Sequence, residues 1–368
     1  MSTADQVTET SVIGALLRGH WYDAASTLLD GSSDGDQSST RSRSEAVSDA
    51  NPSRARAQRL AAAARRVLDL DAEDFASIAT GFHAPWAKRL AECSFPPAPR
   101  EPQRGALGSL ISLYELMLEV LEIRAARREP LQVVVTAHLI GEYLPLLAWE
   151  STLGHGGDPL RLPSFVGGSK WGTDDPSCPH SSALRSTAKR SLNACSGDDA
   201  GYTTYLDRFH SRLGDALAVC AVNLDTTASG DRPEPGDLCP NPCGFIRALP
   251  METRRDLDAR VRLAMLYVES PIVALRHHAP VGHFFGVPSA VEISEAWLLT
   301  WDRLSLPWRD GCNPLSNVIQ RPTAGTEALP GMSTLVSAVA GRPMKAGRLV
   351  RAIGEDVARA LLEDGEAR

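Results

Sequence analysis

Apolar residues recur every three or four positions along most of this chain, a spacing that predicts α-helices. In the segment 106–128 the apolar residues at this spacing are Leu110, Leu113, Met117 and Leu121. The segment 131–150 is apolar on nearly all sides, which is typical of a helix buried at the centre of a protein. Little of the chain alternates in the way that paired strands require. The pattern therefore predicts a mostly α, multi-helix, bundle-like globular protein with irregular Pro- and Gly-rich loops.

Local signals place the ends of several further helices. Asn51 followed by Pro52 fits a cap with proline at the first helical position, and Ser289 with Glu292 has the spacing of a capping box. The other ranges with helical periodicity are 8–30, 181–195, 202–224, 251–270, 289–304 and 345–363. We expect 181–195 and 202–224 to form a hairpin (181–224).

Composition divides the chain into four parts. Residues 1–30 are predicted as an N-terminal amphipathic helix. Residues 31–50, rich in Ser, Gly and Asp, lack the large apolar side chains that would offset the entropy of ordering, so they are predicted as a flexible linker. Residues 51–100 are predicted as a small helical segment that ends at a run of prolines, and 101–368 as the main helical domain.

Charge and apolar content exclude some classes of protein. The net charge of -7 over 368 residues argues against a generally cationic nucleic-acid binder. No stretch approaches the 20 or so apolar residues of a membrane span, and the first residues lack a run of signal-peptide length. We therefore expect a cytoplasmic protein without a membrane partner. In a reducing compartment its seven cysteines suit free thiols or metal ligands better than disulfides.

Four side chains of types that can bind metal ions lie in irregular, proline-flanked backbone. These residues are Cys178, His180, Cys239 and Cys243. Structural zinc takes four thiolate or imidazole ligands, commonly supplied as two short pairs. The predicted hairpin brings the two pairs toward one open end, where a zinc ion would clasp it. Reduced, unliganded thiols and a redox-active site are the alternatives. A closed site of this kind stabilises the fold and catalyses nothing.

A second set of side chains could form a catalytic metal centre. His138 and Glu142 share one face of the most apolar helix, and Asp207 and His210 are three residues apart on another. Helical bundles hold metal ions through such carboxylate and imidazole pairs. Glu115, Glu119 and Glu122 could supply further ligands. A hydrogen-bonded His–Glu pair within the core is the structural alternative.

Arginines concentrate in the segment 41–66 and supply a weak case for nucleic-acid binding. A solvated helix face is the ordinary outcome of such a run. The function that we expect first is an intracellular, zinc-stabilised helical protein with a binding, regulatory or scaffold role and a protein partner. The alternatives are a metal-dependent enzyme with a carboxylate and histidine site in its core, and a weak nucleic-acid binder through 41–66.

Overall fold

The computed structural model describes residues 3–31, 52–95, 109–154, 248–278, 286–316 and 328–366, and within these ranges it contains helices and no strands. The prediction of a mostly α protein is confirmed. The chain divides into two compact units. One combines Met1–Ser94 with Gly347–Arg368, and the other is Phe95–Ala346.

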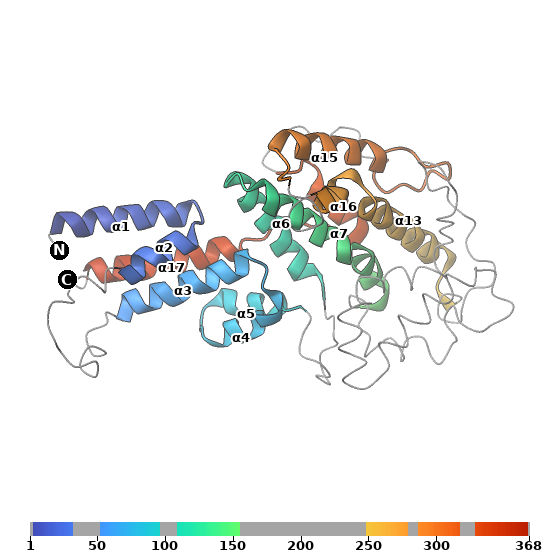
Figure 1. Ribbon diagram of the computed structural model, residues 1–368. Helices are drawn as coiled ribbons and strands as arrows, with labels where there is room; N and C mark the ends of the chain where they lie inside the picture. Colours follow the sequence, from blue (N-terminus) through green and yellow to red (C-terminus); the bar gives the residue numbers. More distant parts are fainter. Residues whose placement is uncertain are drawn as a thin grey trace, which may run out of the picture. The chain divides into compact units, whose positions relative to one another are not determined.

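The first unit joins helices from both ends of the sequence. Its elements are α1 (Thr3–Arg18), α2 (Tyr22–Gly31), α3 (Pro52–Leu68), η1 (Ala72–Asp74), α4 (Phe75–Thr80), α5 (Pro85–Glu92) and α17 (Leu349–Glu366). The last helix packs along α3 and also contacts α1 and α5 (Figure 1). Helix α3 begins at Pro52, as the Asn51–Pro52 signal predicts.

Two features of this unit differ from the sequence-based division. The segment 8–30 forms parts of two helices, because the chain turns between α1 and α2 at residues 19–21. The final helix, which composition placed with 101–368, belongs to the unit that contains α3. Hydrophobic periodicity locates a helix along the chain, but it carries no information on which distant helix covers its apolar face.

Tyr22 anchors α17 to the start of α2. Its side chain is fully buried, and its hydroxyl donates to the carbonyl oxygen of Val350 at 3.2 Å. The hydroxyl oxygen of Tyr22 also lies 3.0 Å from Nδ1 of His20. It sits against Gly354, at whose position a Cβ atom would lie 2.6 Å from the hydroxyl oxygen. Gly354 is therefore the residue that lets α17 approach Tyr22.

Three helices end in the same hydrogen-bonded turn with a residue other than glycine at the left-handed position. His20, Leu70 and Arg128 adopt left-handed backbone conformations with φ of 58°, 56° and 58°. Around Arg128 the amide of Glu129 donates to Arg124 O at 3.0 Å, and the Arg128 amide donates to Ala125 O at 2.9 Å. These are the two bonds of a Schellman motif, whose left-handed position usually holds glycine.

Replacing the exposed Arg128 by glycine is expected to stabilise the second unit by about 0.5–1 kcal/mol, since glycine removes the clash of Cβ in the left-handed region. Chemical denaturation followed by circular dichroism measures the change. The converse substitution, Gly341→Ala, places an alanine at φ 67° in the same unit and should destabilise it. Equal stabilities for wild type and Arg128→Gly would contradict the expectation.

The second unit is built around one long helix. Its elements are α6 (Ile111–Ala126), α7 (Pro130–Leu153), α13 (Met251–Val268), α14 (Pro271–Ala274), η3 (Leu275–His278), α15 (Ala290–Leu304) and α16 (Met332–Ala340). Helices α6, α13, α14 and α16 all pack on α7. The capping box at the start of α15 is confirmed, since the Ser289 and Glu292 side chains each bond the other's backbone amide.

Two buried tyrosines attach neighbouring helices to the backbone of α7. Tyr114 of α6 donates its hydroxyl to Ile140 O at 2.7 Å, and Tyr267 of α13 donates to Ala137 O at 2.8 Å. Burial raises the pKa of both phenols, so both remain protonated donors. Gly141 lies under Tyr267, whose ring atom Cε1 would be 3.2 Å from a Cβ there.

Among the described residues, one stretch of helix, Pro130–Thr152, is long and apolar enough to cross a membrane by length and composition. Its most apolar window is 61% buried. The core helix of a soluble protein passes the same test, and α7 is covered by its neighbours in the second unit. The expectation that no stretch approaches a membrane span in length and composition is therefore wrong for this helix. Its burial agrees with the expectation of a central buried helix at 131–150.

Candidate functional site

The His138–Glu142 pair of α7 lies on one helical face, with His138 Nε2 4.0 Å from Glu142 Oε2. Arg276, from η3, contacts the same imidazole nitrogen through its Nη1 atom. A guanidinium can only donate, so Nε2 must be the accepting nitrogen and the ring proton must be on Nδ1. Among the described residues, Nδ1 is buried without a hydrogen-bond partner.

The surroundings of His138 keep its imidazole neutral. Burial, the largest cause, acts together with the cationic Arg276 and the nearby His277 to lower its pKa from 6.5 to about 4. A neutral imidazole is a metal ligand, but here the lone pair of Nε2 faces a permanent cation. The arrangement suits a hydrogen-bonded anchor between α7 and η3 better than a metal centre.

Glu115, Glu119 and Glu122, the further ligands that the sequence offered, lie on α6 within the described residues. The other six predicted metal ligands lie outside them. These are Asp207 and His210 of the catalytic hypothesis and Cys178, His180, Cys239 and Cys243 of the zinc hypothesis. Within the described ranges no group of three or more His, Cys, Asp or Glu side chains could hold a metal ion. Of the cysteines in these ranges, Cys93 is buried and Cys312 is exposed, both as free thiols.

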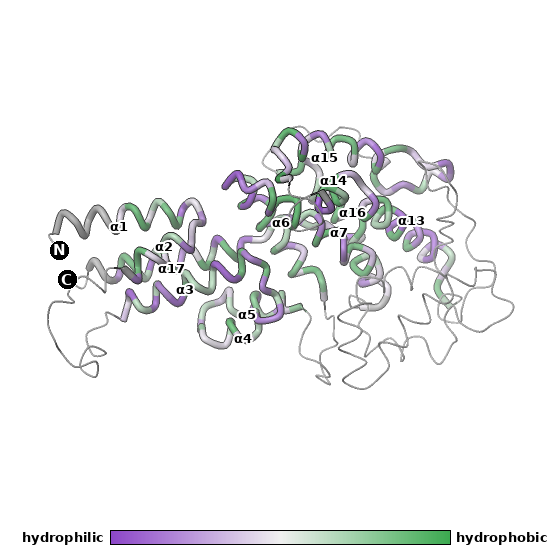
Figure 2. The backbone as a smooth tube through the Cα atoms, in the orientation of Figure 1, coloured by the Kyte–Doolittle hydropathy of each residue, from purple (hydrophilic) through white to green (hydrophobic). Residues whose placement is uncertain are grey.

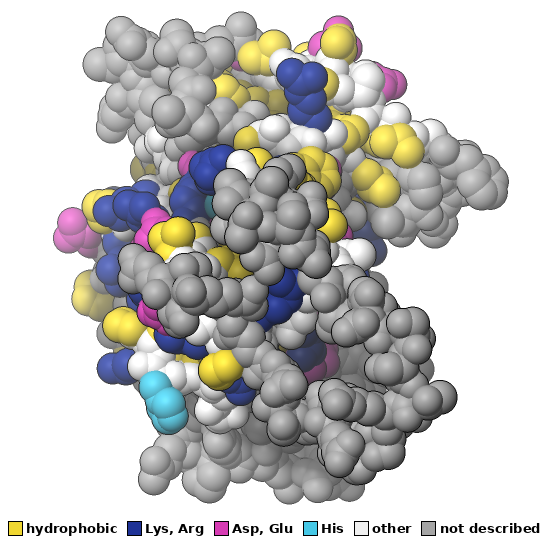
Figure 3. All heavy atoms as spheres, turned by 90° about the vertical axis from the view of Figure 1, so that its left-hand side faces the viewer, with side chains coloured by type: hydrophobic (Ala, Val, Ile, Leu, Met, Phe, Trp, Pro, Cys, Tyr) yellow, Lys and Arg dark blue, Asp and Glu magenta, His cyan; other side chains and the backbone are white. Residues whose placement is uncertain are grey.

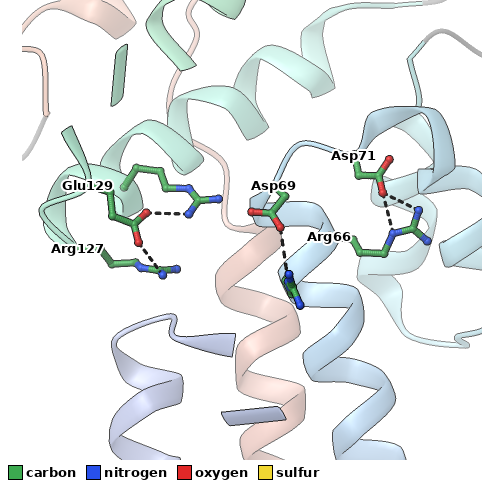
Figure 4. Close-up of polar contacts among 7 residues, drawn as sticks. Arg66, Asp69, Asp71, Arg127 and Glu129 are labelled. Carbon is green, nitrogen blue, oxygen red and sulfur yellow. Dashed lines mark hydrogen bonds and ion pairs between the residues drawn. The ribbon is translucent and has the colours of Figure 1, made fainter. Parts of the chain in front are cut away.

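The arginines of α3 make contacts within the first unit. Arg54 donates to carbonyl oxygens at the end of α2, and Arg56 pairs with Glu363 at 3.3 Å. Arg66 binds Asp71 at 2.6 Å, and Arg65 lies 3.7 Å from Asp69 (Figure 4). Arg66 also contacts Asp74. These contacts give Arg54, Arg56, Arg65 and Arg66 partners within the first unit, while Arg59 is exposed. Arg41 and Arg43 lie outside the described residues.

A similar corner in the second unit joins α6 to α7. Glu129 binds Arg124 through Oε2 and Arg127 through Oε1, each at 2.7 Å (Figure 4). Glu129 is the residue that precedes α7, so the pairs fix the entry to the central helix. These ion pairs hold the connection between α6 and α7, as the contacts of the α3 arginines hold parts of the first unit together.

A buried ionic cluster that sequence patterns did not single out holds the loop after α15. Arg262 of α13 is 3% exposed, and its Nη2 lies 2.6 Å from both Asp258 and Asp310. Trp308 stacks on the guanidinium, with its ring centroid 4.2 Å from Cζ. The Asp258–Arg262 spacing of four residues is visible in the sequence. The cluster itself depends on Asp310, 48 residues away, which no local pattern connects to it.

The two carboxylates of this cluster titrate differently. Burial raises the pKa of Asp258 from 3.8 to about 6 despite the attraction of Arg262. For Asp310, partial burial acts in the same upward direction, but the Cys312 amide and Arg262 outweigh it and lower the pKa. The more exposed Asp310 therefore carries the charge that pairs with Arg262 when Asp258 is protonated.

Asp258 and His138 give the second unit opposite pH dependences. Because the pKa of Asp258 is raised on folding, its contribution is fully present below pH 3.8 and is lost as the pH rises through about 6. Because the pKa of His138 is lowered, its contribution is present above pH 6.5 and is lost as the pH falls through about 4. In the wild type the two slopes largely cancel between pH 4 and 6.

Replacing Asp258 by asparagine should therefore expose the slope of His138. The variant is expected to lose about 2–3 kcal/mol more than wild type between pH 6.5 and 4. His138→Gln should show the reverse trend, with stability that increases as the pH falls. Denaturant unfolding at intervals of half a pH unit measures both, and parallel profiles for all three proteins would contradict the assignment.

Helix α15 presents an apolar outer face at the surface of the second unit. Its inner face is buried through Ile293, Ala296, Trp297, Thr300, Trp301 and Leu304. Opposite these, Val291, Leu298 and Leu299 are 65%, 41% and 62% exposed. We call these three side chains, together with the exposed Val287 and Leu306 that flank the helix, the α15 face. Figure 2 shows hydrophobic and hydrophilic positions alternating along α15.

The ends of the α15 face are held in place by hydrogen-bonded polar side chains. The capping box fixes the start of the helix. Asn313, 3% exposed, donates to Leu304 O at 2.8 Å and to Leu306 O at 2.6 Å, which ties down the end. Trp297 donates to Pro330 O at 3.0 Å from the inner side. The exposed apolar side chains therefore stand on a preorganised element.

No protein-family model, curated protein or solved structure matches this chain.

Proposed function

We propose that this chain is a helical binding protein of scaffold or regulatory type, and that the α15 face is where it recognises a protein partner. The observation that carries the proposal is the outward exposure of Val291, Leu298 and Leu299 on one side of α15. Isolated apolar residues on a surface are ordinary, but several on one helix face are typical of interaction sites.

The rigidity of α15 supports this role. Binding costs free energy for every group that must be ordered, and a helix already fixed at both ends avoids much of that cost. The Arg262 cluster contributes, since Trp308 and Asp310 hold the loop that carries Leu306. Burying an exposed leucine against a partner contributes roughly 1–2 kcal/mol.

The proposal is preferred over a metal-dependent enzyme because Arg276 faces His138 Nε2, the nitrogen that a metal at the His138–Glu142 pair would use.

The proposal also includes a structural zinc ion bound by Cys178, His180, Cys239 and Cys243, independently of the α15 face. Elemental analysis of the purified chain is expected to give about one zinc per molecule. Cys239→Ser should then release the metal and lower the melting temperature together. Metal-free protein of unchanged stability would remove zinc from the proposal and leave the α15 face untouched.

Substitution of the α15 face tests the binding role directly. The wild type, the double variant Leu298→Ser/Leu299→Ser and the control Leu362→Ser are immobilised and exposed to a lysate of the source cells. Leu362 is 64% exposed on α17 and matches the variants in chemistry. We expect a partner, identified by mass spectrometry and then purified, to bind the double variant at least about tenfold more weakly than the other two proteins.

Circular dichroism of the three proteins establishes that the substitutions leave the fold intact. If the purified partner binds the double variant as tightly as it binds the wild type, the α15 face is not the recognition surface.

A further inference from the structure

We infer that the partner of the α15 face is an amphipathic helix that carries Lys or Arg residues two helical turns apart on either side of an apolar centre. This inference rests on the proposed function and specifies the chemistry of the partner. It follows from the order of apolar and acidic side chains along the exposed side of α15.

The acidic side chains lie one turn away from the apolar centre in both directions. Leu298 and Leu299 form the centre, with Glu295 three and four residues before them and Asp302 three and four residues after. Residues at these spacings are neighbours on a helix surface. Glu295 and Asp302 are both exposed and are seven residues apart, which corresponds to about 10.5 Å along the axis.

The exposed charged residues of α15 are all carboxylates: Glu292, Glu295 and Asp302. Hydrogen bonds from Ser289 lower the pKa of Glu292, so this carboxylate is ionised at neutral pH. Arg303, the one cationic residue of the helix, is only partly exposed. In the upper part of Figure 3, hydrophobic side chains lie beside acidic ones and a basic one. The exposed charges of α15 itself are therefore negative and lie around an apolar centre.

This charge pattern distinguishes among the occupants that an apolar face could accept. A second copy docked two-fold on the same face would bring the carboxylates of one copy against those of the other, and like charges across an interface are unfavourable. An anionic lipid surface or a nucleic acid would meet the same repulsion. A helix with an apolar stripe can bury Leu298 and Leu299, and cations seven residues apart along it match both carboxylates.

Selection from a peptide library tests the inference. The probe is a displayed library of 21-residue helical peptides with a fixed leucine stripe, in which the flanking positions are randomised among Lys, Arg, Glu, Asp, Gln and Ser. The full-length chain is the target. We expect the selected peptides to be enriched in Lys or Arg at seven-residue spacing. Their binding should weaken at least tenfold for Glu295→Arg/Asp302→Arg, and selection on that variant should enrich Glu or Asp instead.

The matched control reverses two exposed acidic residues of the first unit, Glu73→Arg/Glu92→Arg, and should select the same basic peptides as the wild type. The inference is overturned if no peptide is selected, if the selected peptides show no excess of basic residues, or if both charge-reversed proteins select alike. Sedimentation showing a wild-type dimer that Leu298→Ser/Leu299→Ser dissociates would also overturn it, in favour of self-association.

Failure of the charge prediction is distinguishable from failure of the proposed function. A purified partner that needs Leu298 and Leu299 but is indifferent to the reversal of Glu295 and Asp302 leaves the binding role standing and removes the basic helix.

Discussion

Arg260→Met is expected to destabilise the second unit by about 3 kcal/mol. The side chain is 3% exposed, and its Nη1 donates to two main-chain oxygens, Ala148 O of α7 at 2.8 Å and Val339 O of α16 at 3.3 Å. Methionine replaces the length of the side chain but none of its donors. Two buried carbonyls would then lose their charged donor, at roughly 1–3 kcal/mol each, partly offset by removal of a buried charge.

The matched control for this substitution is Arg255→Met. Arg255 lies on the same helix α13 and is exposed, so its loss should change stability by less than about 0.5 kcal/mol. Hydrogen exchange of peptides from α7, α13 and α16 resolves the second unit within the full-length chain. If both variants exchange alike, the bonds of Arg260 to the two neighbouring helices do not stabilise the unit.

Gly354→Ala should destabilise the first unit by about 2 kcal/mol. The added Cβ would lie 2.6 Å from the hydroxyl oxygen of Tyr22, whose ring is fully buried and has little room to move. Overpacking and the weakened bond from Tyr22 to Val350 together cost about 3 kcal/mol, and the better helix propensity of alanine returns about 1 kcal/mol. Hydrogen exchange of peptides from α2 and α17 measures the loss.

Two further proteins separate the clash from a general effect of alanine. Gly14→Ala, in α1, would place its Cβ 3.5 Å from the flexible end of Arg18 and should stabilise the unit by up to about 1 kcal/mol. Tyr22→Phe/Gly354→Ala removes the oxygen atom that Cβ would meet, so the double variant should recover most of the stability lost by Gly354→Ala. Additive effects of the two substitutions would show that the hydroxyl is not the source of the destabilisation.

The sequence predicted a metal site at His138 and Glu142 but not the contacts that the folded chain makes there. The reason is the distance along the sequence between the residues involved. His138 and Glu142 are four residues apart, so a helical period is enough to place them on one face. Arg276, which occupies the accepting nitrogen of His138, comes from a different helix and could not be foreseen from that period. The Arg262 cluster was missed for the same reason, since Asp310 and Trp308 belong to a loop after α15.

The left-handed helix ends illustrate a second limit of sequence patterns. Glycine is the usual signal for such an end, and Gly341 carries it at the end of α16. His20, Leu70 and Arg128 adopt the same conformation without the signal, because the hydrogen bonds and packing of the folded chain outweigh the local cost of about 1–2 kcal/mol. The break between α1 and α2 at His20 was hidden within one apparent periodic segment.

The sequence by itself determined the helical class, the central buried helix and individual helix starts such as Pro52 and Ser289, because periodicity and capping act over one or two turns. Only the tertiary structure decided that α17 pairs with α3, that Arg276 and Asp310 join distant partners, and that Val291, Leu298 and Leu299 remain outside. An apolar position in a sequence can be covered or exposed, and the difference depends on which distant surface packs against it.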